Sequence, residues 1–336
     1  MQIKNSDLKD LLFRIASKYV SEEEAKYFSE EIFEAYVRKY PRSNVLKDEV
    51  ITDTARQEKY KDNEFAIEKD LPSLIKLNCN HLPITFKLKW IHDLLVDRAD
   101  KNGIAMVSMY NSGGMHSLHT WSQGLAKRGY FVLGSYNGGP ESVVPLNGTQ
   151  GIFGTNPLTY GFPTNEGTVV IDMATSEIPY FEIRRAKKDG IALKENTAVD
   201  QDGALTTDAA KALAETGISN LLPMGGGYKG YAINYLLEVM TGSLIGAKLS
   251  SQQGPGYVNE DHGGFLIVVN IEAFIQLEKF KNDVSEFNGI VRSQKPAEGK
   301  NIIIPGDNNL ERLATVLKDG FTEVDEEVFN SLKGLA

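Results

Sequence analysis

The sequence predicts a mixed α/β protein, with helices at both chain ends and a sheet-containing region between them. Apolar residues recur at helical spacing before residue 41 and after residue 274, whereas helix and strand patterns alternate in between. A length of 336 residues allows two domains. We therefore expect a helical domain built from residues 1–75 and 275–336, and an α/β domain over 76–274.

The first two helices carry clear start and stop signals. Asn5 or Ser6 is the expected N-cap of the first helix. The second begins at Ser21, since Glu24 completes a capping box, and ends at Pro41. The apolar stripe of the first helix is Leu8, Leu11, Leu12, Ile15 and Tyr19.

Residues 42–80 are highly charged and weakly periodic. This pattern predicts a loop or an exposed extended segment that connects the two regions. A lid or a dimer arm is the alternative.

From residue 83 the elements are bounded by glycines. A helix ends at Asn102-Gly103, and a buried strand follows at 104–110. A helix with Trp121 in the core stops at Gly129, before a strand at 130–136. Further strands are expected at 143–146, 161–164, 168–172 and 264–272, and further helices at 207–216, 229–246, 274–287, 309–319 and 324–334.

Composition excludes several classes of protein. The 41% hydrophobic and 24% charged residues are typical of a soluble globular chain. Cys79 is the single cysteine, so we expect no internal disulfide and a cytosolic setting. A net charge of −9 argues against a nucleic-acid partner. No apolar run approaches the roughly 20 residues of a membrane span, and no secretory leader is expected.

The run Gly225–Gly230 formally matches G-x-G-x-x-G. A dinucleotide fingerprint needs a strand before the glycines and an acid ~20 residues later, and this run has neither. We therefore reject a Rossmann interpretation. Free backbone N–H groups and Lys229 at a helix start suit a phosphate, although a plain helix-initiating turn explains them equally well.

A second polar cluster follows the strand at 168–172. Asp172 ends that strand, and Thr175 and Ser176 come soon after it. An acid with small hydroxyl residues suits a ribose or a nicotinamide amide, and an Asx-type turn is the structural alternative.

Five segments occur in one order: GTNPLTYGFPT, VIDMATSEIPYFEI, VDQDGALTTDAAKAL, LLPMGGGYKGYAINYLLEVMTGSLIGA and IIIPGDNN. In this order they resemble the type-2 malate/L-lactate dehydrogenase family, which includes sulfolactate, ureidoglycolate and 2,3-diketogulonate oxidoreductases and cyclic imino-acid reductases. The resemblance covers residues 103–336 closely and the first helices loosely.

The resemblance implies a non-Rossmann, mostly antiparallel mixed sheet in the domain that binds cofactor and substrate. It also implies a homodimer that uses NAD or NADP. By the same resemblance, Asp172, Met173 and Ala174 line the cofactor, Tyr228 and Lys229 approach it, and Gly306, Asp307 and Asn308 form another wall.

The chain departs from the family where the acid/base chemistry is expected. A 2-oxo acid needs a cation for its carboxylate and a proton donor for the developing alkoxide. The resemblance implies a Ser-His-Gly-Val-x-Arg segment for these two roles. In this chain Asn44 stands at the position of its histidine, and Asp48 stands at the position of its arginine. The position of a second family histidine reads Gly114.

Three interpretations follow. In the first, His116 or His119 takes over the acid/base role. Lys47 or Arg42 then binds a carboxylate, and Asn44 orients a carbonyl oxygen. Alternatively, the substrate is a 2-imino acid, whose iminium accepts hydride without needing a proton donor. In the third, the chain binds the nucleotide without turnover. We expect an NAD(P)-dependent oxidoreductase of a small 2-oxo or 2-hydroxy acid, with His116, Asn44 and Lys47 in the site and no metal.

Overall fold

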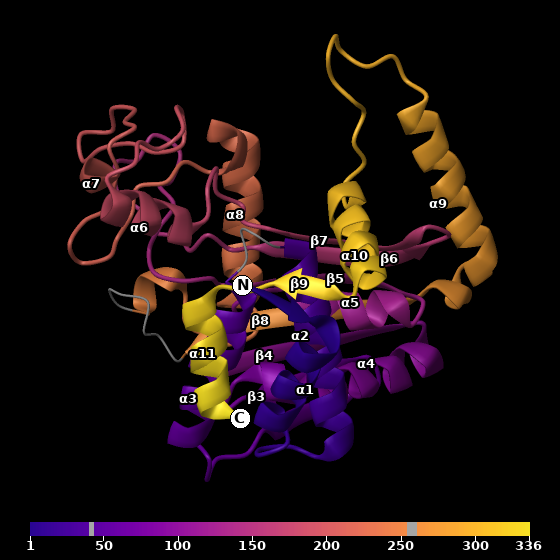
Figure 1. The fold of residues 1–336 in the computed structure, drawn as a ribbon. Coiled ribbons are helices and arrows are strands. Elements are labelled where there is room, and N and C mark those ends of the chain that lie inside the picture. Colours follow the sequence, from indigo (N-terminus) through magenta and orange to yellow (C-terminus); the bar gives the residue numbers. More distant parts are fainter. Residues whose placement is uncertain (40–43, 254–260) are drawn as a thin grey trace.

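The computed structural model describes residues 1–39, 44–253 and 261–336. Over these residues a seven-stranded sheet forms the centre of the molecule (Figure 1). One neighbouring pair of its strands, β3 and β4, is parallel, and the other described pairs are antiparallel. The order across the sheet is β2 (Ala66–Leu71), β3 (Leu74–Asn78), β4 (Ile104–Ser112), β8 (His262–Asn270), β5 (Tyr130–Tyr136), β6 (Leu158–Thr164) and β7 (Gly167–Met173). The predicted mixed α/β class is confirmed.

Helices cover the sheet and extend beyond it (Figure 1). They are α1 (Asn5–Ala16), α2 (Glu22–Lys39), α3 (Asp53–Lys59), α4 (Leu88–Asn102), α5 (His119–Lys127), α6 (Tyr180–Asp189), α7 (Ala209–Ala212), α8 (Tyr228–Thr241), α9 (Leu277–Arg292), α10 (Asp307–Asp319) and α11 (Glu326–Leu335). Among the described residues, no helix is both long and apolar enough to cross a membrane.

The capping predictions had different outcomes. The backbone N–H of Ser21 donates to Glu24 Oε2 at 3.2 Å, and that of Glu24 donates to Ser21 Oγ at 3.4 Å, so the capping box of α2 is confirmed. The predicted cap of α1 is wrong, because Lys4 is the N-cap and makes no side-chain cap bond. Pro41 lies outside the described residues.

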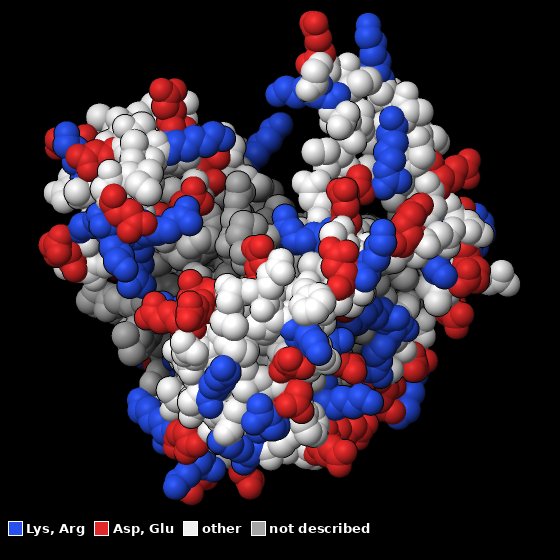
Figure 2. Space-filling model, viewed as in Figure 1, with Lys and Arg blue, Asp and Glu red and all other residues white. Residues whose placement is uncertain are grey.

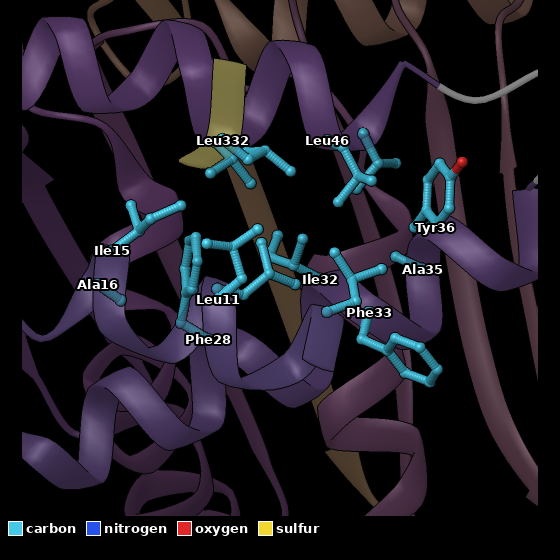
Figure 3. Close-up of a cluster of buried hydrophobic side chains, with 14 of the residues drawn as sticks. Leu11, Ile15, Ala16, Phe28, Ile32, Phe33, Ala35, Tyr36, Leu46 and Leu332 are labelled. Carbon is cyan, nitrogen blue, oxygen red and sulfur yellow. The ribbon is translucent and has the colours of Figure 1, made fainter. Parts of the chain in front are cut away.

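The two chain ends share one hydrophobic core. Leu332 of α11 packs among apolar side chains of α1 and α2, including Leu11 and Phe28 (Figure 3). A short sheet of β1 (Gln2–Lys4) and β9 (Phe321–Glu323) joins the same ends. This packing is consistent with the expected helical domain, although the division of the chain into domains stays a prediction.

The expectation of a loop or an exposed extended segment over residues 42–80 is wrong for the helical residues 46–59, whereas β2 is an exposed strand. Residues Leu46–Thr52 form a π-helix that continues into α3, and β2 and β3 follow. Burial of Leu46 and Val50 anchors the π-helix in the core. The many charged residues around Leu46 and Val50 hide a helical pattern in the sequence. Only the tertiary packing shows that these two positions are buried.

Two smaller predictions also need correction, and one helix was not predicted. In place of the helix expected at 207–216, the structure has only the four-residue helix α7. In place of the strand expected at 143–146, it has an isolated β-bridge at Val143. Helix α6 was not predicted. Its buried residues are Tyr180, Ile183 and Ala186, and three residues form too small a stripe to stand out among its charged residues.

Candidate active site

A cavity of about 640 Å³ opens between the π-helix with α3, the loop after β4, and α6. Its lining includes Asn44, Lys47, Arg56, His116, Arg184 and His262. All three predicted residues of the acid/base site, His116, Asn44 and Lys47, therefore face one space.

His116 is paired with a buried carboxylate. Its Nε2 lies 2.9 Å from Oδ1 of Asp53, which is fully buried. Thr85 Oγ1 donates to the other oxygen of Asp53 at 2.6 Å. The carboxylate thus fixes the orientation of the imidazole, as a proton-transfer site requires.

Two consecutive glycines make room for this site. A Cβ atom at Gly114 would lie 2.4 Å from Cε1 of His116, and one at Gly113 would lie 2.4 Å from Cδ of Arg56. The ring of His116 therefore occupies the space that a side chain at position 114 would fill. His116 follows Gly114 by two residues, and its ring therefore lies near the position where the sequence analysis expected the second family histidine.

Arg56 places a cation beside the pair. One of its terminal nitrogens lies 3.9 Å from Asp53 Oδ1 and has no hydrogen-bond partner among the described residues. The side chain is only 11% exposed. Unfilled guanidinium donors next to a histidine suit the carboxylate of a small acid.

The sequence analysis missed both Asp53 and Arg56. They stand three residues apart in the segment that was interpreted as a loop, so no helical face was assigned to them. A recognisable signal was the i, i+3 spacing of an acid and an arginine, which would have placed both on one side of a helix. Arg42 lies outside the described residues.

Two further histidines differ in position. His262 opens β8 and lines the cavity, and its Nδ1 lies 3.0 Å from the carbonyl oxygen of Asn137. That contact makes Nδ1 the protonated nitrogen, and burial lowers the pKa of His262 to about 4. His119 is buried in α5 and is not part of the cavity lining; burial holds its pKa well below the usual range.

Asp172 at the end of β7 is held by three donors. Its Oδ2 accepts hydrogen bonds from Lys39 Nζ at 2.8 Å, Ser117 Oγ at 3.2 Å and the backbone N–H of His119 at 3.2 Å. One carboxylate oxygen is therefore engaged within the protein. The loop that carries His116 is tied to the strand end through its neighbour Ser117.

After Asp172, two hydroxyl side chains bond to backbone carbonyl oxygens. Thr175 Oγ1 lies 3.0 Å from the carbonyl oxygen of Asn156, and Ser176 Oγ donates to the carbonyl oxygen of Ile178 at 2.7 Å. Both hydroxyl hydrogens are used by the backbone. Met173 and Ala174 therefore lie between Asp172 and Thr175, which are both held by hydrogen bonds.

The glycine turn lies next to this segment. The backbone N–H of Met224 donates to the carbonyl oxygen of Thr175 at 2.9 Å. Gly225 and Gly226 have positive φ angles of 71° and 60°, which glycine adopts readily. Tyr228 and Lys229, the first residues of α8, are exposed.

The start of α10 lies against the same strand. A Cβ at Gly306 would lie 3.6 Å from Val169 of β7, and Asp307, which precedes Asn308, forms a 2.7 Å ion pair with Arg292. Figure 2 shows the molecule hollowed between the lobe of α6–α8 and the arm of α9 and α10. The structure thus brings the glycine turn, the segment after β7 and the start of α10 to one strand.

Comparisons with known proteins show the family of this chain. A family model for malate/L-lactate dehydrogenase matches residues 3–333. Over 100% of this chain and 97% of the relative, the sequence is 28% identical to a malate/(S)-sulfolactate dehydrogenase of Methanothermus fervidus. It is 34% identical to a Delta(1)-pyrroline-2-carboxylate/Delta(1)-piperideine-2-carboxylate reductase of Pseudomonas putida, over 53% of this chain and 52% of that one. The solved sulfolactate dehydrogenase of Methanocaldococcus jannaschii superposes with a TM-score of 0.82 at 26% identity, covering 100% of this chain and 96% of that chain.

Proposed function

The chain belongs to the malate/L-lactate dehydrogenase family, whose members are oxidoreductases, and from that premise we propose that it transfers a hydride between NAD(P) and a small 2-oxo or 2-hydroxy acid. The observation that carries this proposal is the His116–Asp53 pair inside the cavity. Arg56 beside the pair supplies the cation that such an acid needs.

Each side chain has a distinct role in this reaction. Arg56 binds the substrate carboxylate, with Lys47 as a second cation and Asn44 as a donor to the carbonyl oxygen. His116 gives its proton to that oxygen as the alkoxide develops, and recovers it in the reverse direction. Asp53 acts through His116, by holding the ring in one orientation.

The residues around β7 fit a nicotinamide cofactor, which supplies or accepts the hydride when bound. Lys229 and the backbone N–H groups of the glycine turn form the positive start of α8, which suits a pyrophosphate. We propose that Asp172, Met173, Ala174, Thr175, Ser176 and Tyr228, with Gly306, Asp307 and Asn308, line the rest of this non-Rossmann site.

The substrate could instead be a 2-imino acid. The likeness to the Pseudomonas putida reductase favours this second candidate, and Asn44 at the family histidine position is compatible with it. A protonated imine becomes a neutral amine on receiving hydride, so the reaction does not need His116.

The test is an absorbance assay of NADH and NADPH oxidation on a panel of 2-oxo and cyclic 2-imino acids, with wild type and His116→Ala. We expect the variant to lose about 100-fold or more in kcat on 2-oxo acids. Unchanged turnover of an imino acid would identify the second candidate. Nucleotide binding in a fluorescence titration without any turnover would overturn both and favour a nucleotide-binding protein.

We further propose that the protein is a cytosolic homodimer. One face of α8 leaves apolar side chains exposed, namely Ile233, Tyr235, Leu236 and Val239. An apolar helix face of this size is typical of an interface, and a second copy of the chain would cover it. Light scattering on the purified protein measures the mass in solution, and a monomer would contradict the proposal.

A further inference from the structure

The cavity of the candidate active site contains a carboxylate that no described residue neutralises. Asp48 lies on the π-helix and lines this cavity. Its side chain is half-buried and makes no ion pair or hydrogen bond with another described residue. Its chain neighbour Lys47 does not pair with it, because consecutive residues of a helix do not face each other. A half-buried carboxylate without a donor costs free energy, so Asp48 is suited to accept one from a bound molecule.

Asp48 belongs to the same stretch of helix as the acid/base pair. Asp53, which holds His116, follows Asp48 by five residues, which is close to one turn of a π-helix. Burial raises the pKa of Asp48, and His116 is the group that opposes this effect most strongly. Asp48 and His116 therefore lie close enough, at one cavity, for a small molecule between them to meet both.

Two groups of opposite charge flank the His116–Asp53 pair along this helical segment. Asp48 precedes Asp53 by five residues, and Arg56 follows it by three. In the proposed function, Arg56 binds the carboxylate next to the reacting carbon. The rest of the substrate lies on the other side of the reacting carbon, which is the side of Asp48.

The basic residues of α6 that line the same cavity do not cancel the charge of Asp48. Arg184, Arg185 and Lys188 are exposed, and water and salt screen exposed charges more than half-buried ones. Arg184 also influences the pKa of Asp48 less than His116 does. Near the reacting carbon, the half-buried carboxylate therefore has the larger effect on a small substrate.

We propose that Asp48 determines specificity by binding a cationic group on the side chain of the substrate and by repelling a second acid group. The inference rests on the proposed function and narrows its substrate class to 2-oxo or 2-hydroxy acids that carry an ammonium or guanidinium group. Such a cation would form a charge-assisted hydrogen bond with Asp48. A second carboxylate or sulfonate would meet a like charge at the same place, which disfavours its binding.

The experiment varies the charge of the substrate at constant chain length. The substrates are 4-amino-2-hydroxybutanoate, 2-hydroxybutanoate and malate, which carry a cation, no charge and an anion at carbon 4. Their oxidation is followed by the absorbance of the reduced nicotinamide. We expect kcat/KM of the wild type to fall in this order, by at least about 10-fold from the first to the last. In Asp48→Asn this difference should shrink to less than about 3-fold.

Asp189→Asn is the matched control. It removes the same charge from an exposed residue of α6 that lines the same cavity. The control should keep the substrate order of the wild type. Asp48→Ser repeats the test with a smaller side chain, and circular dichroism checks that each variant is folded.

A measurement without turnover separates this inference from the proposed function. We expect 4-amino-2-hydroxybutanoate to raise the Tm of the wild type more than malate does. This difference should disappear in Asp48→Asn and persist in Asp189→Asn. That result supports the inference even if no hydride transfer is found.

Three results would overturn the inference alone. In the first, malate raises the Tm of the wild type at least as much as 4-amino-2-hydroxybutanoate does. In the second, both variants of Asp48 keep the substrate order of the wild type. In the third, Asp189→Asn abolishes that order as fully as Asp48→Asn, which would assign the effect to the charge of the whole cavity. If none of the three acids is oxidised or raises the Tm, the proposed function fails together with the inference.

Discussion

At the scale of single residues, the π-helix beside the site carries a buried acid that has no hydrogen-bond partner among the described residues. Both carboxyl oxygens of Glu49, on the π-helix, are buried and make no hydrogen bond to a described residue. Burial raises the pKa of Glu49 well above 4.5, and the negative charges of Asp53 and Asp172 add to this effect, while Lys39 opposes it. The folded protein therefore keeps a proton on Glu49 that the unfolded chain releases.

This predicts how the variant Glu49→Gln behaves. A raised pKa in the folded state means that stability is complete below pH 4.5 and is lost as the pH rises toward the folded pKa. The loss amounts to as much as about 1.4 kcal/mol per pH unit. Glutamine mimics the neutral acid, so the stability of Glu49→Gln relative to wild type should increase between pH 5 and pH 8. Urea unfolding at several pH values measures it, and a constant difference would show that Glu49 is ionised.

A second residue-scale prediction concerns Lys229. If its ammonium binds a phosphate of the cofactor, Lys229→Ala should weaken NADH and NADPH binding by about 1–3 kcal/mol. Isothermal titration calorimetry measures both affinities. Lys101→Ala is the control, because that side chain is 67% exposed on α4 and pairs with Asp97. Equal affinities in wild type and Lys229→Ala would remove Lys229 from the cofactor site.

At the scale of elements, the loop after β4 controls where the acid/base group lies. Gly114→Ala would put a Cβ atom 2.4 Å from the ring of His116, so the ring must move away from Asp53. We expect kcat/KM to fall at least about 10-fold, because proton transfer depends on this orientation. Circular dichroism and Tm should change little.

Gly289→Ala is the matched control for this change. An added Cβ there meets nothing within 4 Å, and alanine suits the interior of α9 better than glycine. Its activity should equal that of wild type. Full activity of Gly114→Ala would show that the position of His116 over the glycine does not matter for the reaction.

Elements with strong local signals were predicted well. Helix α4 ends at Asn102, as its glycine predicted, since Gly103 has a φ of 78°. Strand β4 begins at Ile104, as predicted, and β5 matches its predicted range of 130–136. The π-helix and α6 were missed because their buried residues are few and no local pattern marks a short helix that is held mainly by tertiary contacts.

At the scale of the whole molecule, three buried histidines contribute to its response to acid. Burial lowers the pKa of His92 to about 3 and that of His262 to about 4, and it holds the pKa of His119 well below 6.5. The side chain of His92 is fully buried, and its Nδ1 lies 2.7 Å from Tyr27 Oη.

The consequence is a loss of stability below neutral pH. A lowered histidine pKa means that stability is complete above 6.5 and falls as the pH drops, because the unfolded chain binds protons that the folded one cannot. Each histidine contributes a slope of as much as about 1.4 kcal/mol per pH unit. Denaturant unfolding at pH 7, 6 and 5 measures the total slope. His92→Gln should reduce it, whereas an unchanged slope would contradict the assignment.

The sequence alone determined the helical ends, the mixed middle and the family motifs, because each depends on periodicity or order along the chain. The roles of the cofactor residues stay predictions. Only the tertiary structure decided which side chains meet. His116 and Asp53 are 63 residues apart, and Lys39 and Asp172 are 133 apart. Such contacts depend on how the sheet and the π-helix pack, and the spacing of residues along a chain does not encode that packing locally.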